Sequence, residues 1–445
     1  MPFGLRPLRV ANPYFMFNHP RTTSELVLPT SKRPRCHRFL VAALLGISLL
    51  GWQWTARGQE PTVVGPTVEL PTKSGGAYGS EPVATAVRTS PKVELYTEFM
   101  VGYDDNFRTR SDAAGSWFTN GRATLTYRPG FRDMDFDLVT GASVNEYFQN
   151  RTDLNIFLGL TLDRKLTPRL TLDANVYAAY RSEPDFGANI GPNQVRGNYF
   201  TTSDRLSGTY QVTRRFATVT SYQLKLIRYE DSFTAAFSDR GEHTFGEQFR
   251  FDISRSTVLT GDYRFLVVDY VTAPRNSLTH FVLAGIEHQF NADLHGQLRG
   301  GVSLRSFEQD GDSANPDVEW SLDYNYSRDS SLSWTGSYSV EESTNALTAE
   351  RTTVRTQLQL NQHFTNRISG SLSFAYHHDD NTQPTTSLLT VQNFTEDSFR
   401  VAVSLKYQVN RWVDVNAQYE HSEVSSQALQ SYSRNRYSIG VGLRF

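Results

Sequence analysis

Apolar and polar residues alternate with a period of two from about residue 93 to the C-terminus. Near the end of the chain, every second residue is apolar, at Val413, Val415, Ala417 and Tyr419. Successive side chains of a β-strand point to opposite faces, so each such segment has one apolar and one polar face. The alternation recurs in residues 170–180, 320–326, 368–376 and 401–409. A helix would need apolar residues at i, i+3, i+4 and i+7, and we therefore predict strands.

Short polar turns separate the predicted strands. They lie near Pro129, Pro168, Arg214, Arg255, Ala292, Arg328, Asn366 and Arg411. In several of these turns an apolar residue is followed by Ser, Thr or Asn. Such side chains form hydrogen bonds with the nearby backbone and favour tight turns. The turns are roughly 36 to 46 residues apart, so each interval holds two strands and one longer loop. One strand before the first turn and one after the last give about 18 strands, with 16–18 as the range.

The longer loops fall between the turns. We predict them at residues 104–116, 182–197, 309–315 and 380–393. Short periplasmic turns and longer extracellular loops are typical of outer-membrane barrels. The predicted fold is all-β, a transmembrane antiparallel up-and-down β-barrel in the outer membrane. The alternative is a soluble β-sandwich or propeller, but a propeller would repeat in four-stranded blades, and a sandwich would bury its aromatic residues without membrane belts.

Aromatic residues gather at two levels along the predicted strands. Those beside the turns are Tyr127, Phe216, Phe290, Tyr326, Phe364 and Trp412. Those near the loops are Tyr147, Tyr180, Tyr229, Tyr270, Tyr338, Tyr376 and Tyr419. The two sets are about 9 to 13 residues apart, close to the length of a tilted transmembrane strand. We expect two aromatic belts at the two membrane interfaces.

A targeting segment precedes the strands. Four basic residues between positions 32 and 38 are followed by the apolar run Phe39–Trp54 and by the small residues Ala56 and Gly58. This order is that of a secretory signal peptide. The alternative is a membrane anchor, but the run of about 16 residues is shorter than the roughly 20 that a spanning helix needs.

The chain therefore divides into three predicted parts. Residues 1–58 form an N-terminal extension and signal peptide, which includes Cys36, the single cysteine. Residues 59–92, rich in Pro, Thr, Gly and Val, form a disordered periplasmic linker. Residues 93–445 form the barrel. The linker is too short for the globular plug of a TonB-dependent receptor.

Composition agrees with a barrel and excludes one class of partner. The chain has 44 Lys and Arg against 46 Asp and Glu, so no basic surface points to nucleic acid. Hydrophobic residues make up 38%, and the mean hydropathy is −0.46, low for a packed soluble core. A barrel with a wet interior and a lipid-facing exterior has such a composition.

The last strand carries the most specific local pattern. Apolar residues alternate to the terminal carboxylate at Tyr437, Ile439, Val441, Leu443 and Phe445. This pattern looks like the signal by which the barrel-assembly machinery selects outer-membrane proteins. The alternative is an ordinary edge strand that ends the chain.

The segment Val101-Gly102-Tyr103-Asp104-Asp105-Asn106 ends the first predicted strand. It resembles the opening of the putative β-barrel porin 2 family, and the hairpin repeats and the terminal Phe are similar to that family over residues 93–445. The resemblance implies a barrel with a porin-like role. Some relatives are associated with exopolysaccharide production and export. The family supplies no catalytic residues.

Charged residues on the polar faces of the strands are the candidate site. A barrel of 16–18 strands leaves an aqueous channel that side chains alone do not fill. Charges there could set ion preference, or they could simply pair across strands. The predicted pore-lining residues are Arg122, Arg128, Asp137, Asp173, Lys225, Arg250, Asp262, Arg264, Arg299, Arg305, Glu319, Asp323, Arg355, Arg400, Lys406, Asp414, Arg436 and Arg444.

Other chemistry has little support. His377 and His378 suggest a metal site, but neighbouring residues of a strand face opposite ways and do not converge on one ion. No nucleotide-binding loop, zinc-hydrolase motif or nucleophile elbow is present, and we expect no cofactor and no enzyme activity.

We therefore predict a porin-like channel for passive diffusion of small hydrophilic solutes. The alternatives are a barrel component of exopolysaccharide production or export without channel activity, and an outer-membrane hydrolase. The expected partners are outer-membrane lipid, the barrel-assembly machinery, and small solutes or polysaccharide. The oligomeric state stays open, with a homotrimer as the arrangement known for porins.

Deleting Phe445 is expected to impair assembly, because the terminal aromatic residue completes the predicted recognition pattern. The measurement is the amount of heat-modifiable barrel in the membrane fraction. Normal levels after the deletion would contradict this interpretation of the C-terminus.

Overall fold

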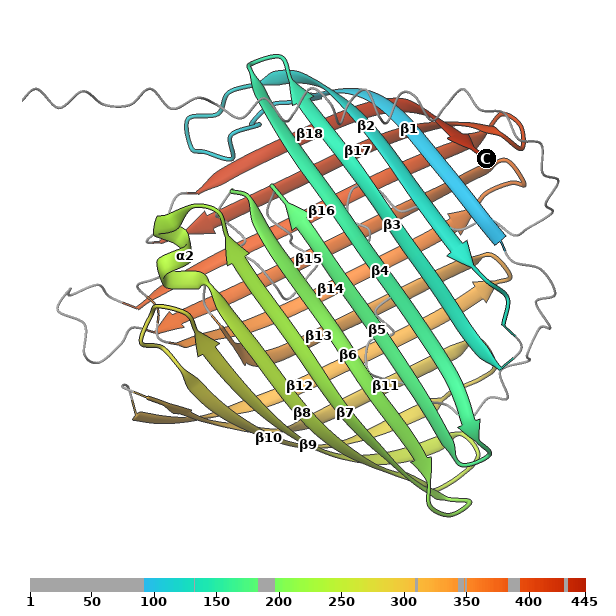
Figure 1. Cartoon of the computed structure of the whole chain (residues 1–445), viewed down its shortest axis with the longest axis vertical. Helices are drawn as coiled ribbons and strands as arrows, with labels where there is room; N and C mark the ends of the chain where they lie inside the picture. The colour runs from blue at the N-terminus through green and yellow to red at the C-terminus, as the bar shows by residue number, and fades with distance from the viewer. Residues whose placement is uncertain are drawn as a thin grey trace, which may run out of the picture. The chain divides into compact units, whose positions relative to one another are not determined.

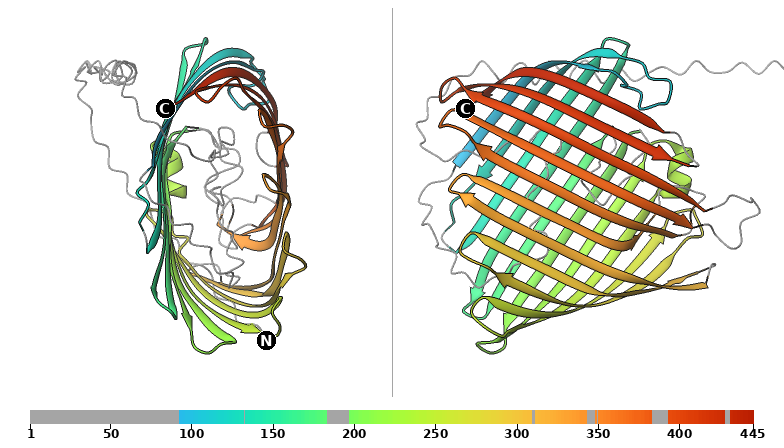
Figure 2. Two further views of the ribbon diagram at one scale, coloured as in Figure 1. Left: turned by 90° about the vertical axis from the view of Figure 1, so that its right-hand side faces the viewer. Right: turned by 180° about the vertical axis from the view of Figure 1, so that it is seen from behind.

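One closed sheet makes up the described part of the protein. The computed structural model describes residues 92–445 except 132, 183–196, 309–310, 343–347, 349, 383–392 and 428–430. These residues form an 18-stranded antiparallel sheet in which β1 pairs with both β2 and β18, so the sheet has no free edge. The strands are arranged as a ring of tilted ribbons (Figures 1 and 2). The predicted fold class and the count of 18 strands are confirmed.

The bounds of the elements are as follows: β1 (Lys92–Asp104), β2 (Ser116–Arg128), β3 (Met134–Tyr147), β4 (Arg151–Thr167), β5 (Leu170–Arg181), β6 (Tyr199–Gln211), β7 (Phe216–Tyr229), α2 (Ser232–Ser238), β8 (Arg240–Asp252), β9 (Thr257–Tyr270), β10 (Ser277–Gln289), β11 (Leu294–Phe307), β12 (Gly311–Ser327), β13 (Ser330–Glu341), β14 (Glu350–His363), β15 (Ile368–Thr382), β16 (Phe394–Gln408), β17 (Val413–Ser426) and β18 (Tyr432–Arg444). No helix in this part of the chain has the length and hydropathy needed to span a bilayer.

The two ends of the barrel differ in their connections. Eight turns of two to five residues join the strands at one end, which we call the turn end. All eight predicted turn positions fall within these connections. The connections at the other end, the loop end, span three to seventeen residues and include α2 (Figure 1). In outer-membrane barrels the turn end faces the periplasm.

One predicted loop is wrong in part. Residues 309–315 were expected to form a loop because they are polar and contain glycine, but β12 begins at Gly311. Gly311 pairs with Phe307, and the ladder continues through Ser313 opposite Arg305. Pairing with β11 therefore overrides the local turn propensity of this segment. The predicted loop 104–116 agrees with the gap between β1 and β2, whereas most of 182–197 and 380–393, and residues 1–91, lie outside the described residues.

The outer face of the barrel is apolar. Alternate residues of β1 and β18 project outward, and Phe99 and Ile439 are 58% and 61% exposed. In water such exposure would be costly, whereas in a bilayer these side chains contact lipid tails and no core has to bury them. The residues between them face inward and are mostly polar, as the period of two predicts.

The aromatic belts are only partly as predicted. Five of the six aromatic residues beside the turns face outward, namely Tyr127, Phe216, Phe290, Tyr326 and Phe364, as do Tyr180, Tyr338, Tyr376 and Tyr419. Trp412 lies in its turn opposite Arg444 of the inner face and does not continue this set. Tyr147, Tyr229 and Tyr270 instead face inward and are at most 7% exposed. Each packs against other interior groups near the loop end: Tyr147 against Phe107 and Phe118, Tyr229 against Tyr199. The loop-end belt is therefore interrupted, and three of its tyrosines pack among side chains of the inner face instead.

Side chains cap the tight turns. The Thr365 hydroxyl accepts hydrogen bonds from the backbone N–H groups of Arg367 and Ile368, at 3.2 and 3.0 Å. The Asn410 side-chain oxygen likewise accepts from the backbone N–H groups of Trp412 and Val413, at 2.8 and 3.0 Å. Equivalent caps come from Thr167, Thr213, Ser254 and Asn291. These bonds satisfy N–H groups that the ladder leaves free, which explains the Ser, Thr and Asn pattern in the sequence.

A buried ion pair fastens the seam, the pairing of β1 with β18. Asp104 is fully buried, and its two carboxylate oxygens share the Nε–H of Arg434, at 3.1 and 3.0 Å. Nη2 of Arg434 donates to the same carboxylate at 2.5 Å. The phenol of Tyr147 on β3 donates to the same carboxylate at 3.1 Å. This network therefore joins the first, third and last strands of the barrel.

The rest of the segment Val101–Asn106 serves the same seam. Gly102 lies under the ring of Phe118, where a Cβ atom would come within 2.4 Å of the ring and 2.3 Å of a backbone oxygen of β18. Asp105 accepts hydrogen bonds from both the backbone and side-chain N–H groups of Asn435, at 2.6 and 2.7 Å. Asn106 donates to the carbonyl oxygen of Ser433 at 2.9 Å. The motif is thus a clasp between the two ends of the sheet.

Replacing Asp104 with Asn is expected to lower the free energy of unfolding by about 3 kcal/mol, because it leaves the buried guanidinium of Arg434 without its charge partner. Urea unfolding of the barrel in detergent, followed by heat-modifiable mobility, measures the change. Asp112→Asn, at an exposed position of the first loop, is the matched control. Equal stability of the two variants would contradict the proposed role of the pair.

Candidate functional site

The polar residues predicted for the interior all share one face of the sheet. Following the strand register around the barrel places all eighteen on the same side. This side is the concave one: Arg264 on β9 reaches Glu319 on β12 at 2.6 Å. Strands are about 4.8 Å apart, so these two would be roughly 14 Å apart on a flat sheet. Their side chains converge only inside the barrel.

Four of the predicted residues form a cluster on β9, β11 and β12. Arg264 binds Asp262 and Glu319, at 3.1 and 2.6 Å. Arg299 reaches the same two carboxylates, at 3.1 and 3.4 Å. The side chains of Arg264 and Glu319 are 25% and 30% exposed, so this pair borders the open interior, whereas Arg299 lies against the wall.

Most of the remaining predicted arginines pair with acids outside the predicted set. Twelve of the eighteen predicted residues are basic and six are acidic, which by themselves imply an interior with a positive field. The structure adds carboxylates on the same face, in these pairs: Arg122–Glu98, Arg250–Glu287, Arg305–Glu342, Arg355–Glu341, Arg400–Glu420 and Arg444–Glu94. The charges of the wall are therefore compensated locally, and the interior is hydrophilic without a strong field of one sign.

The other predicted residues also have polar neighbours on this face. Arg128 binds Asp137 at 3.0 Å, and Lys406 binds Asp414 at 3.2 Å. The remaining four are Arg436, which lies opposite Glu420, and Asp323, Lys225 and Asp173. Arg436 donates to Asn145 and Asp323 accepts from Ser333, while Lys225 stands opposite Glu242 and Asp173 opposite Ser207.

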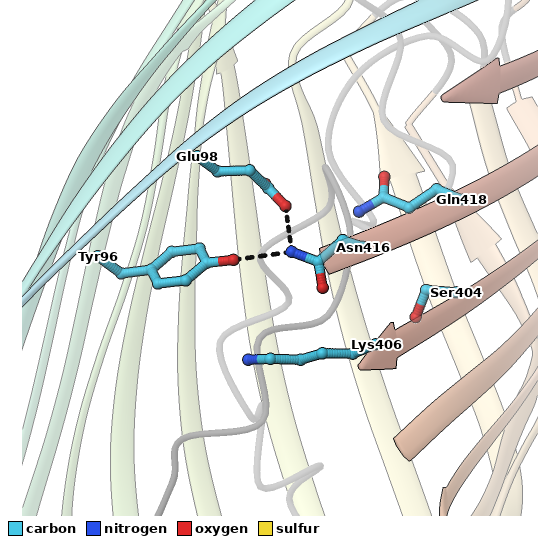
Figure 3. Close-up of a pocket in the computed structure, with 6 residues that line it drawn as sticks. All are labelled: Tyr96, Glu98, Ser404, Lys406, Asn416 and Gln418. Atoms are coloured by element: carbon cyan, nitrogen blue, oxygen red, sulfur yellow. Dashed lines mark hydrogen bonds between the residues drawn. The ribbon is translucent and has the colours of Figure 1, made fainter. Parts of the chain in front are cut away.

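A small polar pocket lies in the wall beside the seam (Figure 3). Tyr96 and Glu98 enter it from β1, and Asn416 extends toward both of them from β17. The Asn416 amide donates to Glu98 Oε1 at 2.6 Å and to Tyr96 Oη at 2.9 Å. Lys406, Ser404 and Gln418 complete the lining.

The pocket exists because β18 has no side chain at this level. Gly442 lies between β1 and β17, and a Cβ atom there would come within 2.1 Å of the Tyr96 hydroxyl. The phenol therefore crosses β18 and donates to Asp414 at 2.9 Å. This second network stabilises the seam nearer the turn end. The polar side chains that line the pocket also offer hydrogen-bond donors and acceptors to the barrel interior.

The two neighbouring histidines do not form one site. His377 faces inward opposite Arg355 and is 1% exposed, whereas His378 faces outward opposite Asp397. Nδ1 of the His378 ring lies 2.8 Å from the Asp397 carboxylate. Within the described ranges, no group of three or more His, Cys, Asp or Glu residues is placed to hold a metal ion.

Three solved structures resemble this chain at low sequence identity. Acinetobacter baumannii OccAB4 is 9% identical, with a TM-score of 0.41 over 80% of this chain and 99% of that one. Pseudomonas aeruginosa OccK2 (OpdF), solved with glucuronate, is 12% identical, with a TM-score of 0.42 over 80% and 98%. Pseudomonas aeruginosa OpdQ is 10% identical, with a TM-score of 0.41 over 80% and 99%. A search among curated proteins finds no match.

The sequence itself matches one family model. The model is described as putative beta-barrel porin 2, and it matches residues 91–445, which include every strand of the sheet. The seam clasp that begins at Val101 and the C-terminal strand that closes the ring both lie within this match. The chain therefore belongs to the putative beta-barrel porin 2 family and is a β-barrel protein of the outer membrane.

Proposed function

We propose that the protein is a channel through which small hydrophilic solutes diffuse passively across the outer membrane. The observation that carries this proposal is the wall: a closed sheet of 18 strands has a polar, ion-paired inner face and an apolar outer face. Barrels of 16–18 strands are wide enough for an aqueous passage. A wall so rich in paired charges would be costly to bury against an apolar filling, and water offsets that cost.

Compensated charges imply weak ion selectivity. The acidic and basic side chains of the inner face alternate within single clusters, such as that of Asp262, Arg264 and Glu319. A passing ion meets both signs within a few ångströms, so attraction and repulsion largely cancel. Hydrogen-bonding side chains, such as those that line the pocket at Asn416, favour solutes that form hydrogen bonds.

Assembly is the second part of the proposal. The outward side chains of Tyr437, Ile439, Val441, Leu443 and Phe445 are 40% to 61% exposed and form one apolar ridge. We propose that the barrel-assembly machinery recognises this ridge before β18 pairs with β1. The backbone of Phe445 then exchanges hydrogen bonds with Leu95, at 2.8 and 3.1 Å.

The protein purified from outer membranes is expected to give stable conductance steps of nanosiemens size in a planar bilayer. The physical reason is the hydrophilic wall of the wide barrel. Single-channel recording in potassium chloride makes the measurement. A folded, heat-modifiable barrel without conductance would overturn the channel proposal.

Glu319→Gln is expected to raise the anion-to-cation permeability ratio by about threefold at low salt, because a unit charge about 7 Å from an ion in water is worth roughly RT. Arg264→Gln is expected to shift the ratio in the opposite direction. Reversal potentials across a salt gradient measure both shifts, and low ionic strength keeps screening small.

The double variant Glu319→Gln/Arg264→Gln serves as the control, since it removes both charges of the pair. Its permeability ratio is expected to return close to that of the unaltered protein. If both single variants shift the ratio in the same direction, or if neither shifts it, the pair does not border the conducting path.

A further inference from the structure

Exposed arginines recur at the turn end. In six of the eight turns at least one arginine lies within the turn and is exposed to solvent. These residues are Arg169, Arg214, Arg215, Arg255, Arg328, Arg367 and Arg411. The turns at 290–293 and 129–133 are the exceptions among the described residues, and Arg132 in the latter lies outside them.

Among the residues that the structure describes, none of the seven guanidinium groups forms an ion pair, and Arg411 only stacks on the neighbouring ring of Trp412, at 4.8 Å. The eight turns contain three aspartates, Asp133, Asp293 and Asp329. The turn end is therefore positive, although the whole chain has a net charge of −2.

A lipid-facing apolar residue also lies two or three positions before the first arginine of each of these turns. These residues are Leu166, Val212, Ile253, Tyr326, Phe364 and Val409, and they are 36% to 61% exposed on the outer face. A residue pair this close in sequence spans at most about 10 Å. When the apolar side chain lies at the edge of the hydrocarbon layer, the guanidinium therefore reaches the level of the lipid phosphates.

Side-chain caps hold the backbone in five of these six turns. The caps formed by Thr167, Thr213, Ser254, Thr365 and Asn410 fix the backbone between the apolar residue and the following strand. Less conformational entropy is then lost when the arginine binds a ligand. Turn residues that serve solubility alone need no such repeated order of apolar residue, cap and arginine.

We propose that these turns form an arginine collar that binds the phosphate groups of anionic glycerophospholipids in the periplasmic leaflet. Guanidinium groups bind phosphate through two parallel hydrogen bonds, and clustered basic residues beside a membrane attract anionic lipids. Lipid is favoured over an acidic protein partner because every arginine of the collar follows a side chain that already faces the bilayer. The collar is independent of solute passage, so it stands whether or not the barrel conducts.

The protein, purified from outer membranes in mild detergent, is exchanged into mixed micelles with equal amounts of phosphatidylglycerol and phosphatidylcholine. Native mass spectrometry then counts the bound lipids. We expect about fivefold more phosphatidylglycerol than phosphatidylcholine on the protein. The variant with Arg169, Arg214, Arg215, Arg367 and Arg411 replaced by Gln is expected to bind the two lipids about equally.

Arg108→Gln/Arg110→Gln, at exposed positions of the first loop, is the control at the opposite end of the barrel. It is expected to keep the preference for phosphatidylglycerol. Only heat-modifiable, folded samples are compared, and a smaller variant, Arg367→Gln/Arg411→Gln, is expected to lose part of the preference. An unchanged preference in the five-site variant, no preference in the unaltered protein, or an equal loss in the loop control would each overturn the proposal.

Discussion

Closure of the sheet is the constraint on which the structure depends. In a bilayer no water satisfies a free strand edge, so the backbone groups of β1 must find partners more than three hundred residues away on β18. The chain reinforces this pairing from the inner side at two levels. The Asp104–Arg434 pair fastens it near the loops, and the Tyr96–Asp414–Asn416 network braces it nearer the turns. In the second network the Tyr96 side chain crosses β18, where Gly442 leaves room for it.

The same closure determines the chemistry of the interior. Curvature brings side chains from strands two or three apart into contact, so arginines find carboxylates that neighbouring strands do not offer. An unpaired charge against the wall would be costly, whereas a paired one keeps the surface hydrophilic at low cost. The result is an interior lined by many charges with little net field. A wall of this kind suits a passage for polar solutes better than a selective filter for ions.

Sequence patterns predicted the structure correctly where the interactions involve residues close together in the chain. Alternation shows which residues share a face, and turn caps depend on neighbours two or three residues away. The same alternation already places two tyrosines of the predicted loop-end belt on the inward face. Tyr229 lies four residues after Lys225, and Tyr270 lies six after Arg264, so each shares the inward face of its strand. Segment 311–315 was different, because its pairing with β11 extends beyond what its polar, glycine-containing sequence indicates.

By itself the sequence determined the all-β class, the number of strands, the positions of the turns and which residues share one face of a strand. It did so because strand geometry repeats every two residues and tight turns need particular side chains. Only the tertiary structure decided which charges meet. Arg264 and Glu319 are 55 residues apart, and their contact depends on strand stagger and curvature, which are properties of the closed ring. For the same reason, only the folded barrel shows Asp104 as a clasp between the ends of the chain.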